Sequence, residues 1–247
     1  ERYRVLHGDI DGRPLGQLRA GYGVAVAALA VLDYLGIPCA EATVAIQGFG
    51  ALARAAAYGL SKKDVRIVAL ADYEKSIIST QEQGLEVAEL LQSSGTLLPE
   101  AGCGSGVNVK NREAVCSVPC DILIPAAVEN TITENVAKDL QVKAVVPGAN
   151  LAVTGEAADL LHQRGILVLP DLLTGSGGSL SMEGLFAPKD TPSPAEVLSH
   201  VEQRMTALVN QIISRSKKEN ITPTRAALRM CSEISAQPGA RPYGNAY

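Results

Sequence analysis

The sequence is poor in the residues that carry metal or hydrolytic chemistry. Its 247 residues include three histidines and five cysteines. No Ser-His-Asp arrangement, metal-ligand helix motif or nucleophile elbow occurs among them. Cys116 and Cys120 have three residues between them and no histidine nearby, which is not the spacing of common zinc knuckles. We therefore expect no metal site.

Net charge and long hydrophobic runs are also scarce. The formal net charge of −4 gives no general attraction to nucleic acid or to an anionic membrane, so we expect neither as a partner. The apolar run Val24–Leu35 has 12 residues, too few to cross a bilayer. An odd number of cysteines and no visible signal segment predict reduced thiols and a cytoplasmic location.

Apolar residues are abundant and regularly arranged. Hydrophobic residues make up 47% of the chain and charged residues 19%, which is typical of an ordered globular protein. The predicted strands are Thr43–Gln47, Val65–Ala71, Asp121–Pro125, Lys143–Pro147 and Ile166–Pro170. The predicted helices between them are Ala51–Leu60, Gln83–Leu91, Glu134–Leu140 and Gly155–Arg164. This alternation predicts an α/β fold, Rossmann-like and doubly wound, with a mostly parallel sheet covered by helices on both faces.

Changes in composition divide the chain into three segments. Residues 1–20 are polar and are predicted as an irregular N-terminal extension. Residues 21–187 form the predicted Rossmann-like domain, which begins with a helix over Gly21–Leu35. Within it, the glycine-rich Ser93–Arg112 is predicted as an excursion from the core. Residues 188–247 form a C-terminal helical segment.

A glycine turn follows the first predicted strand of the sheet. Gly48 allows a tight turn, and Gly50 lets the backbone approach a pyrophosphate that the N–H groups of the next helix can bind. Small Ala53 lets that helix pack closely on the strand. Asp72 ends the next strand, 24 residues after Gly48, where a carboxylate can accept both ribose hydroxyls. The pattern predicts a dinucleotide site.

Two alternatives stay open at this point. Glycine turns after strands are common in α/β proteins, so the turn alone is compatible with a purely structural role. For the nucleotide, Asp72 favours NAD over NADP because its charge repels a 2′-phosphate, whereas nearby Lys75 weakens that preference.

Several further segments share their order with the motifs of one known family. They are Ala45–Gly50, Cys120–Ala127 with Glu129-Asn130, Gly148–Asn150, Thr154–Asp159, Gly165–Asp171 with Gly177-Gly178, and Ile221–Met230. Together they resemble the glutamate/leucine/phenylalanine/valine dehydrogenase family. With the glycine turn, the resemblance implies these cofactor-binding residues: Gly48, Phe49, Gly50, Ala51, Leu52, Asp72, Tyr73, Ala126, Ala127 and Asn150.

The resemblance is partial. Members of the family carry an N-terminal substrate domain with catalytic lysines and an aspartate, and Asp11–Leu15 resembles the segment that follows that domain. Ala20 stands where the family has a threonine that bonds the nicotinamide amide, and Gly175 where it has an asparagine that faces nicotinamide and substrate. The catalytic residues are therefore unknown. The polar side chains that we expect along the cleft are Arg13, Arg19, Tyr22, Ser176 and Ser179.

The resemblance implies an NAD-dependent oxidoreductase that transfers hydride at the amine or imine carbon of an amino acid or a 2-keto acid-like substrate. The alternatives are a non-catalytic nucleotide-binding subunit, a fragment of a longer amino acid dehydrogenase, and a fold repurposed for another ligand.

Two predicted C-terminal helices, Ala195–Lys217 and Thr224–Ile234, indicate whether the chain associates with a partner. The first has an apolar stripe made of Leu198, Val201, Met205, Leu208 and Ile212. Left uncovered, this stripe favours a homo-oligomer or a heteromeric partner chain.

Overall fold

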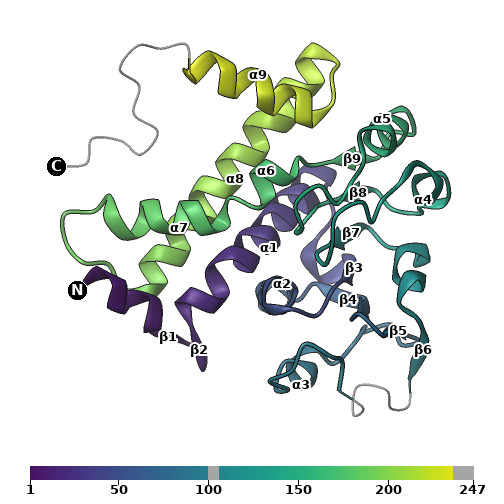
Figure 1. The fold of residues 1–247 in the computed structure, drawn as a ribbon, viewed down its shortest axis with the longest axis horizontal. Helices are drawn as coiled ribbons and strands as arrows, with labels where there is room; N and C mark the ends of the chain where they lie inside the picture. Colours follow the sequence, from purple (N-terminus) through teal and green to yellow (C-terminus); the bar gives the residue numbers. More distant parts are fainter. Residues whose placement is uncertain (100–105, 236–247) are drawn as a thin grey trace.

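A seven-stranded sheet forms the centre of the computed structural model, which describes residues 1–99 and 106–235 (Figure 1). In spatial order the strands are β6 (Val107–Asn111), β5 (Lys75–Ser79), β4 (Arg66–Ala71), β3 (Thr43–Gln47), β7 (Ile122–Pro125), β8 (Ala144–Val145) and β9 (Leu167–Val168). The five neighbouring strands β4, β3, β7, β8 and β9 are parallel, whereas β5 and β6 are antiparallel additions at one edge. The prediction of a Rossmann-like, mostly parallel α/β sheet is confirmed.

Helices cover both faces of the sheet (Figure 1). In chain order they are α1 (Leu15–Leu35), α2 (Ala51–Ser61), α3 (Val87–Leu90), α4 (Glu134–Asp139), α5 (Gly155–Gln163), α6 (Asp171–Thr174), α7 (Gly177–Phe186), α8 (Pro194–Glu219) and α9 (Pro223–Ser235). Short 3-10 helices span Arg2–His7, Cys39–Glu41 and Arg112–Ser117. Val44 and Ile46 of β3 belong to the core with α1 and α2, whereas Ala45 between them belongs to the core with α4 and α5.

The first helix is longer than the sequence predicted. It begins at Leu15 rather than at Gly21, because Pro14 supplies the extended residue before it and Leu15 and Leu18 are buried one turn apart. Residues 1–20 are also less irregular than expected, since they contain a 3-10 helix and the hairpin strands β1 (Asp9–Ile10) and β2 (Arg13–Pro14). With 21 residues, α1 is long and apolar enough to cross a membrane by length and composition, but 67% of its most apolar window is buried inside the molecule.

Glycines allow α1 to approach its neighbours closely. A Cβ on Gly21 would collide with the carbonyl oxygen of Leu52 in α2. A Cβ on Gly23 would lie 2.6 Å from the Cα of Gly177 in α7. Gly177 lies in the first turn of α7, a helix that the sequence did not predict, and allows this helix to pack closely on α1.

Three further differences from the predicted elements lie near the antiparallel edge. Strand β5 was not predicted, and the predicted excursion Ser93–Arg112 contains edge strand β6, which pairs with β5. The outer strand is almost fully exposed, so its residues lack the apolar pattern used for prediction. The predicted helix Gln83–Leu91 shortens to the single turn α3, because Gly84 has a left-handed φ of +85° and Leu85 N–H bonds to the carbonyl of Ile67. Elsewhere, the predicted strand Thr43–Gln47 matches β3, whereas the other predicted strands and helices differ from the structure at one or both ends; β8 and β9, for instance, keep two residues each.

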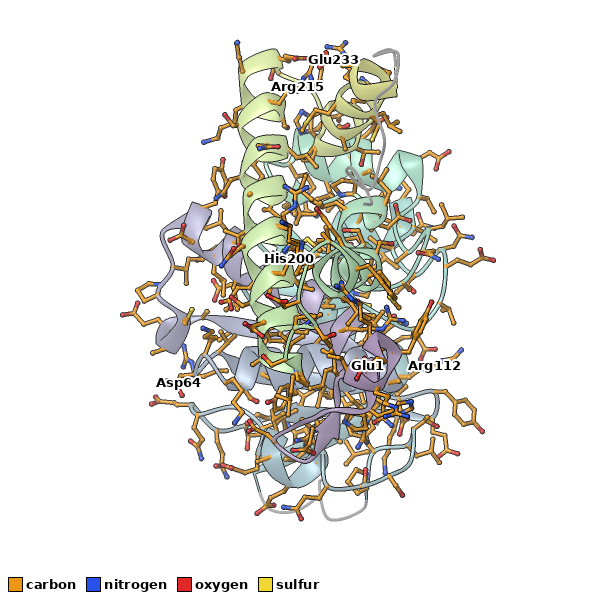
Figure 2. All side chains as sticks on the ribbon, turned by 90° about the vertical axis from the view of Figure 1, so that its left-hand side faces the viewer. Glu1, Asp64, Arg112, His200, Arg215 and Glu233 are labelled. Atoms are coloured by element: carbon orange, nitrogen blue, oxygen red, sulfur yellow. The ribbon has the colours of Figure 1, made fainter. Side chains whose placement is uncertain are left out.

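The C-terminal helices close over α1. The predicted stripe on α8 is buried within the chain, where Val201, Met205 and Ile212 contact the core that includes α1. The sequence argument for an uncovered docking surface on α8 is therefore wrong. An ion pair binds α9 to α8: Arg215, which also pairs with Glu219 of its own helix at 2.6 Å, pairs with Glu233 of α9 at 2.5 Å (Figure 2).

Candidate functional site

The candidate site lies where the chain reverses its direction across the sheet. From β3 the chain adds β4 on one side and later β7 on the other, so the loops after β3 and β7 diverge at the carboxyl edge. Open α/β sheets bind their ligands in the crevice at such a point. Most of the predicted site residues lie on the loops that leave this edge.

The first glycine of the turn is required by geometry. Gly48 has φ +120°, a conformation that residues with a Cβ rarely adopt, and its N–H donates to Ala71 O at 2.8 Å. A Cβ there would lie 2.9 Å from the carbonyl oxygen of Ala126, in the loop after β7. Gly48 and Ala126 thus form a tight backbone contact at the bottom of the crevice.

The second glycine faces open space. Gly50 is the N-cap residue of α2, and a Cβ built on it meets nothing within 4 Å. No side chain caps the start of α2 in the described part of the chain, so the first N–H groups, from Ala51 and Leu52, are free to bind an anion. The space and the donors fit a pyrophosphate at this helix end. Ala53 is buried, as close packing of α2 on the sheet requires.

The loops after β7 and β8 complete this end of the crevice. Ala126 is half-buried and Ala127 is exposed. A Cβ on Gly148, after β8, would lie 2.8 Å from Cδ2 of Leu52 and 2.9 Å from Cβ of Ala126. The structure therefore brings the predicted residues Gly48, Leu52 and Ala126 together and adds Gly148.

Asp72 lies at the end of β4, as predicted, but its carboxylate is already engaged. Its Oδ1 accepts the N–H groups of Glu74 at 2.7 Å and Lys75 at 2.8 Å, and its Oδ2 accepts that of Leu98 at 2.6 Å. The side chain is buried, whereas the neighbouring Tyr73 is 70% exposed. Asp72 therefore closes the β4–β5 turn and holds the segment near Leu98 against the sheet. Its contact with ribose stays a prediction.

Arg54 was not singled out from the sequence, yet it organises the same side of the site. It projects from the first turn of α2, its guanidinium lies 4.8 Å from the ring centre of Phe49, and it donates to the carbonyl oxygens of Leu91, Ser93 and Gly95. Phe49 itself is 2% exposed, so only its backbone can take part in binding. Nothing in the sequence pattern distinguishes Arg54 from a solvated helix arginine.

Asn150 lies at the other end of the crevice, in the loop after β8. Its side chain is exposed, and its Oδ1 lies 3.7 Å from the position that a Cβ of Gly175 would occupy. The next residue, Leu151, donates its N–H to Oδ2 of Asp171 at 2.6 Å. Asp171 ends the motif Gly165–Asp171, and nothing in the sequence pattern indicates its contact with Leu151.

The polar residues expected along the cleft do not form a catalytic cluster. Arg13 lies over the ring of Tyr58, and Arg19 donates to Gly178 O at 2.9 Å. Tyr22 points toward α8 and donates to Glu202 at 3.4 Å, and its burial raises its pKa to about 12. Ser176 donates to Leu173 O, and Ser179 is exposed.

Most of the chain matches one known family. Residues 15–237 match the model of a family described as Glutamate/Leucine/Phenylalanine/Valine dehydrogenase. The chain belongs to this family. Its relatives include the glutamate dehydrogenases, which are oxidoreductases.

Individual relatives show how far the similarity extends. The glutamate dehydrogenase of Thermotoga maritima is 33% identical over 219 residues, which cover 84% of this chain and 50% of the relative. The solved structure of the hetero-hexameric glutamate dehydrogenase of Thermus thermophilus, in its leucine-bound form, superposes with a TM-score of 0.74 and 28% identity. It covers 92% of this chain and 53% of the relative. The chain therefore spans about half the length of the relatives it matches.

The named cofactors of the relatives differ. The NADP-specific glutamate dehydrogenase of Saccharolobus shibatae is 39% identical over 55% of this chain and 31% of its own length. The NAD-specific enzyme of Clostridioides difficile is 34% identical over 69% of this chain and 43% of its own length. Members of the family thus use NAD or NADP.

Proposed function

We propose that this chain is the nucleotide-binding part of an NAD-dependent oxidoreductase related to the amino acid dehydrogenases. The observation that carries the proposal is the uncapped start of α2 beside Gly50, directly after the left-handed Gly48 turn at the sheet's reversal point. Backbone N–H groups at a helix N-terminus bind phosphate because they are unpaired donors at the positive end of the helix dipole.

Different residues around the crevice would bind different parts of the nucleotide. The N–H groups of Ala51 and Leu52 would hold the pyrophosphate, Asp72 and the segment near Leu98 would form the ribose side, and Asn150 would lie at the nicotinamide end. Bound NAD supplies a ring that accepts or donates hydride. The chain's own residues bind and orient it, and Gly48 and Ala126 seal the bottom of the crevice with backbone.

Asp72 supports NAD rather than NADP as the cofactor. Its buried carboxylate lies at the end of β4, where a 2′-phosphate would meet its negative charge. We expect NADH to bind at least tenfold more tightly than NADPH, which is ~1.4 kcal/mol. A titration monitored by nucleotide fluorescence measures the affinities for NADH and NADPH, and equal affinities would overturn the preference.

The proposed reaction is hydride transfer at an amine or imine carbon. The test is NADH oxidation with a panel of 2-keto acids plus ammonia, and with cyclic imines. We expect turnover with at least one substrate. If NADH binds but no substrate is turned over, the independent-enzyme form of the proposal fails while nucleotide binding stands.

A second candidate is a nucleotide-binding subunit that needs another chain for catalysis. One observation favours it: Arg13 and Tyr22 are committed to contacts within the fold. The Thermus relative is hetero-hexameric, so assembly with other chains has a precedent in the family. Light scattering after size exclusion tests this candidate, and a clean monomer with turnover of its own would exclude it.

A further inference from the structure

Leu151 has a backbone conformation that its residue type does not favour. It has φ +52°, and the other described non-glycine residues with positive φ are aspartates and asparagines, which tolerate this region better. Its side chain is 63% exposed, so packing does not hold it in place. Something other than the side chain must fix this residue.

Two backbone hydrogen bonds fix it. The N–H of Leu151 donates to Oδ2 of Asp171 at 2.6 Å, and its carbonyl accepts the N–H of Asn130 at 2.8 Å. The other carboxylate oxygen of Asp171 accepts the N–H of Leu172 at 2.8 Å, so the carboxylate is anchored to the first turn of α6. Hydrogen bonds to a charged acceptor are the stronger kind, which suits a group that must hold a strained residue.

The strained residue directly follows Asn150. The side chain of Asn150 is exposed and lies beside Gly175, at the end of the crevice proposed for nicotinamide. Among residues 1–99 and 106–235, no hydrogen bond holds the side chain of Asn150, so its position depends on the peptide between it and Leu151. Backbone strain of this kind is typical of functional sites, where it pre-organises a neighbouring group.

We propose that Asp171 is a positioning residue: by holding Leu151 in the left-handed conformation, it fixes Asn150 at the nicotinamide end of the site. The proposal rests on the proposed function for the identity of the ligand. It needs no contact between Asp171 and the ligand. Without the carboxylate, Leu151 relaxes to a negative φ and the amide of Asn150 turns away from the crevice.

The experiment compares two ligands that differ at the relevant end. Asp171→Asn keeps the size of the side chain but replaces one acceptor oxygen with a donor. We expect its affinity for NADH to fall by about five- to thirtyfold, the ratio that corresponds to the cost of a left-handed leucine. The affinity for ADP-ribose, which lacks nicotinamide, should change less than about twofold, within the error expected of a distant site.

A second substitution tests the mechanism by rescue. Glycine adopts positive φ without penalty, so Leu151→Gly in the Asp171→Asn background should restore most of the NADH affinity. Asp159→Asn is the matched control, because Asp159 is an exposed acid that lines the same cavity as Asp171 and should leave both affinities unchanged. Equal losses for NADH and ADP-ribose, or no rescue by glycine, would overturn the proposal.

A crystal structure of unliganded Asp171→Asn separates this proposal from the proposed function. We expect Leu151 to have a negative φ in that variant and Asn150 to be displaced. If φ stays positive, Asp171 does not hold the residue and the proposal is wrong. If the wild-type chain binds neither NADH nor ADP-ribose, the proposed function fails, and the role of Asp171 in binding fails with it.

Discussion

Replacing Gly48 with alanine should cost stability as well as nucleotide binding. The left-handed φ of +120° costs a residue with a Cβ about 1–2 kcal/mol. The new methyl would lie 2.9 Å from Ala126 O and 3.0 Å from its carbonyl carbon, both backbone atoms that cannot rotate away. Overpacking of this kind adds about 1–3 kcal/mol. We expect a total loss near 3 kcal/mol, or roughly 6–12 °C in Tm for a domain of this size.

Gly50→Ala is the matched control. Its Cβ would enter open space, so only the loss of a good N-cap residue acts on stability, at most about 1 kcal/mol. The methyl would, however, stand where the pyrophosphate is proposed to approach. We expect NADH affinity to fall at least about tenfold, which is ~1.4 kcal/mol. One substitution therefore acts strongly on both folding and binding, and the other mainly on binding.

Thermal unfolding by circular dichroism and titration followed by NADH fluorescence measure the two quantities. The chain has no tryptophan, so the emission of NADH is read against a low protein background. Equal Tm losses in both variants would contradict the geometric account of Gly48. Wild-type affinity in Gly50→Ala would refute the placement of the pyrophosphate.

Three further predictions concern other parts of the fold. Burial raises the pKa of Asp121, but hydrogen bonds from Lys143 and Thr43 lower it more, so its folded pKa lies below the usual 3.8. Its ionised form thus stabilises the fold at neutral pH, and Asp121→Asn should lower the unfolding free energy by about 1–2 kcal/mol at pH 7, with the difference shrinking below pH 3.8. Burial raises the pKa of Cys120 to about 12, so at pH 8 iodoacetamide should label exposed Cys231 before Cys120, as peptide mapping would show. Arg54→Ala should speed amide hydrogen exchange over residues 91–98, because that segment loses its bonds to the guanidinium.

Each of these predictions has a defined contrary result. A stability difference for Asp121→Asn that does not shrink as the pH falls below 3.8 would show that the effect is not one of ionisation. Labelling of Cys120 at the rate of Cys231 would mean that the thiol is not buried in solution. For Arg54, a matched Arg225→Ala variant controls for the loss of a helix arginine, and exchange that is equally fast in both variants would contradict a specific role.

The parallel part of the fold was predictable because its sequence signals are local. Thr43–Gln47 matched β3 residue for residue, and the N-cap threonines of α4 and α5 mark helix starts within one residue of the prediction. The antiparallel edge was not predictable, because β6 is exposed and gains its structure from pairing with β5 rather than from its own pattern. The burial of the α8 stripe also depends on a distant element, since α1 covers it.

In the candidate site, too, residues with a local sequence signal were predictable and contacts between distant residues were not. Gly48 and Gly50 were found because a turn of this geometry requires glycine at fixed positions, and the structure gives each a different reason. Asp72 was placed correctly at the end of β4, but no local signal announces that a backbone N–H from residue 98 reaches its carboxylate. The role of Asp171 has no local signal for a similar reason: its hydrogen-bond partner, Leu151, is 20 residues away in the chain.

A crystal structure of the chain with NADH tests the central claim most directly. We predict the pyrophosphate at the start of α2 beside Gly50 and the nicotinamide toward Asn150. A nucleotide bound elsewhere, or a crevice at the carboxyl edge of β3 that excludes NADH at saturating concentration, would contradict the proposed function.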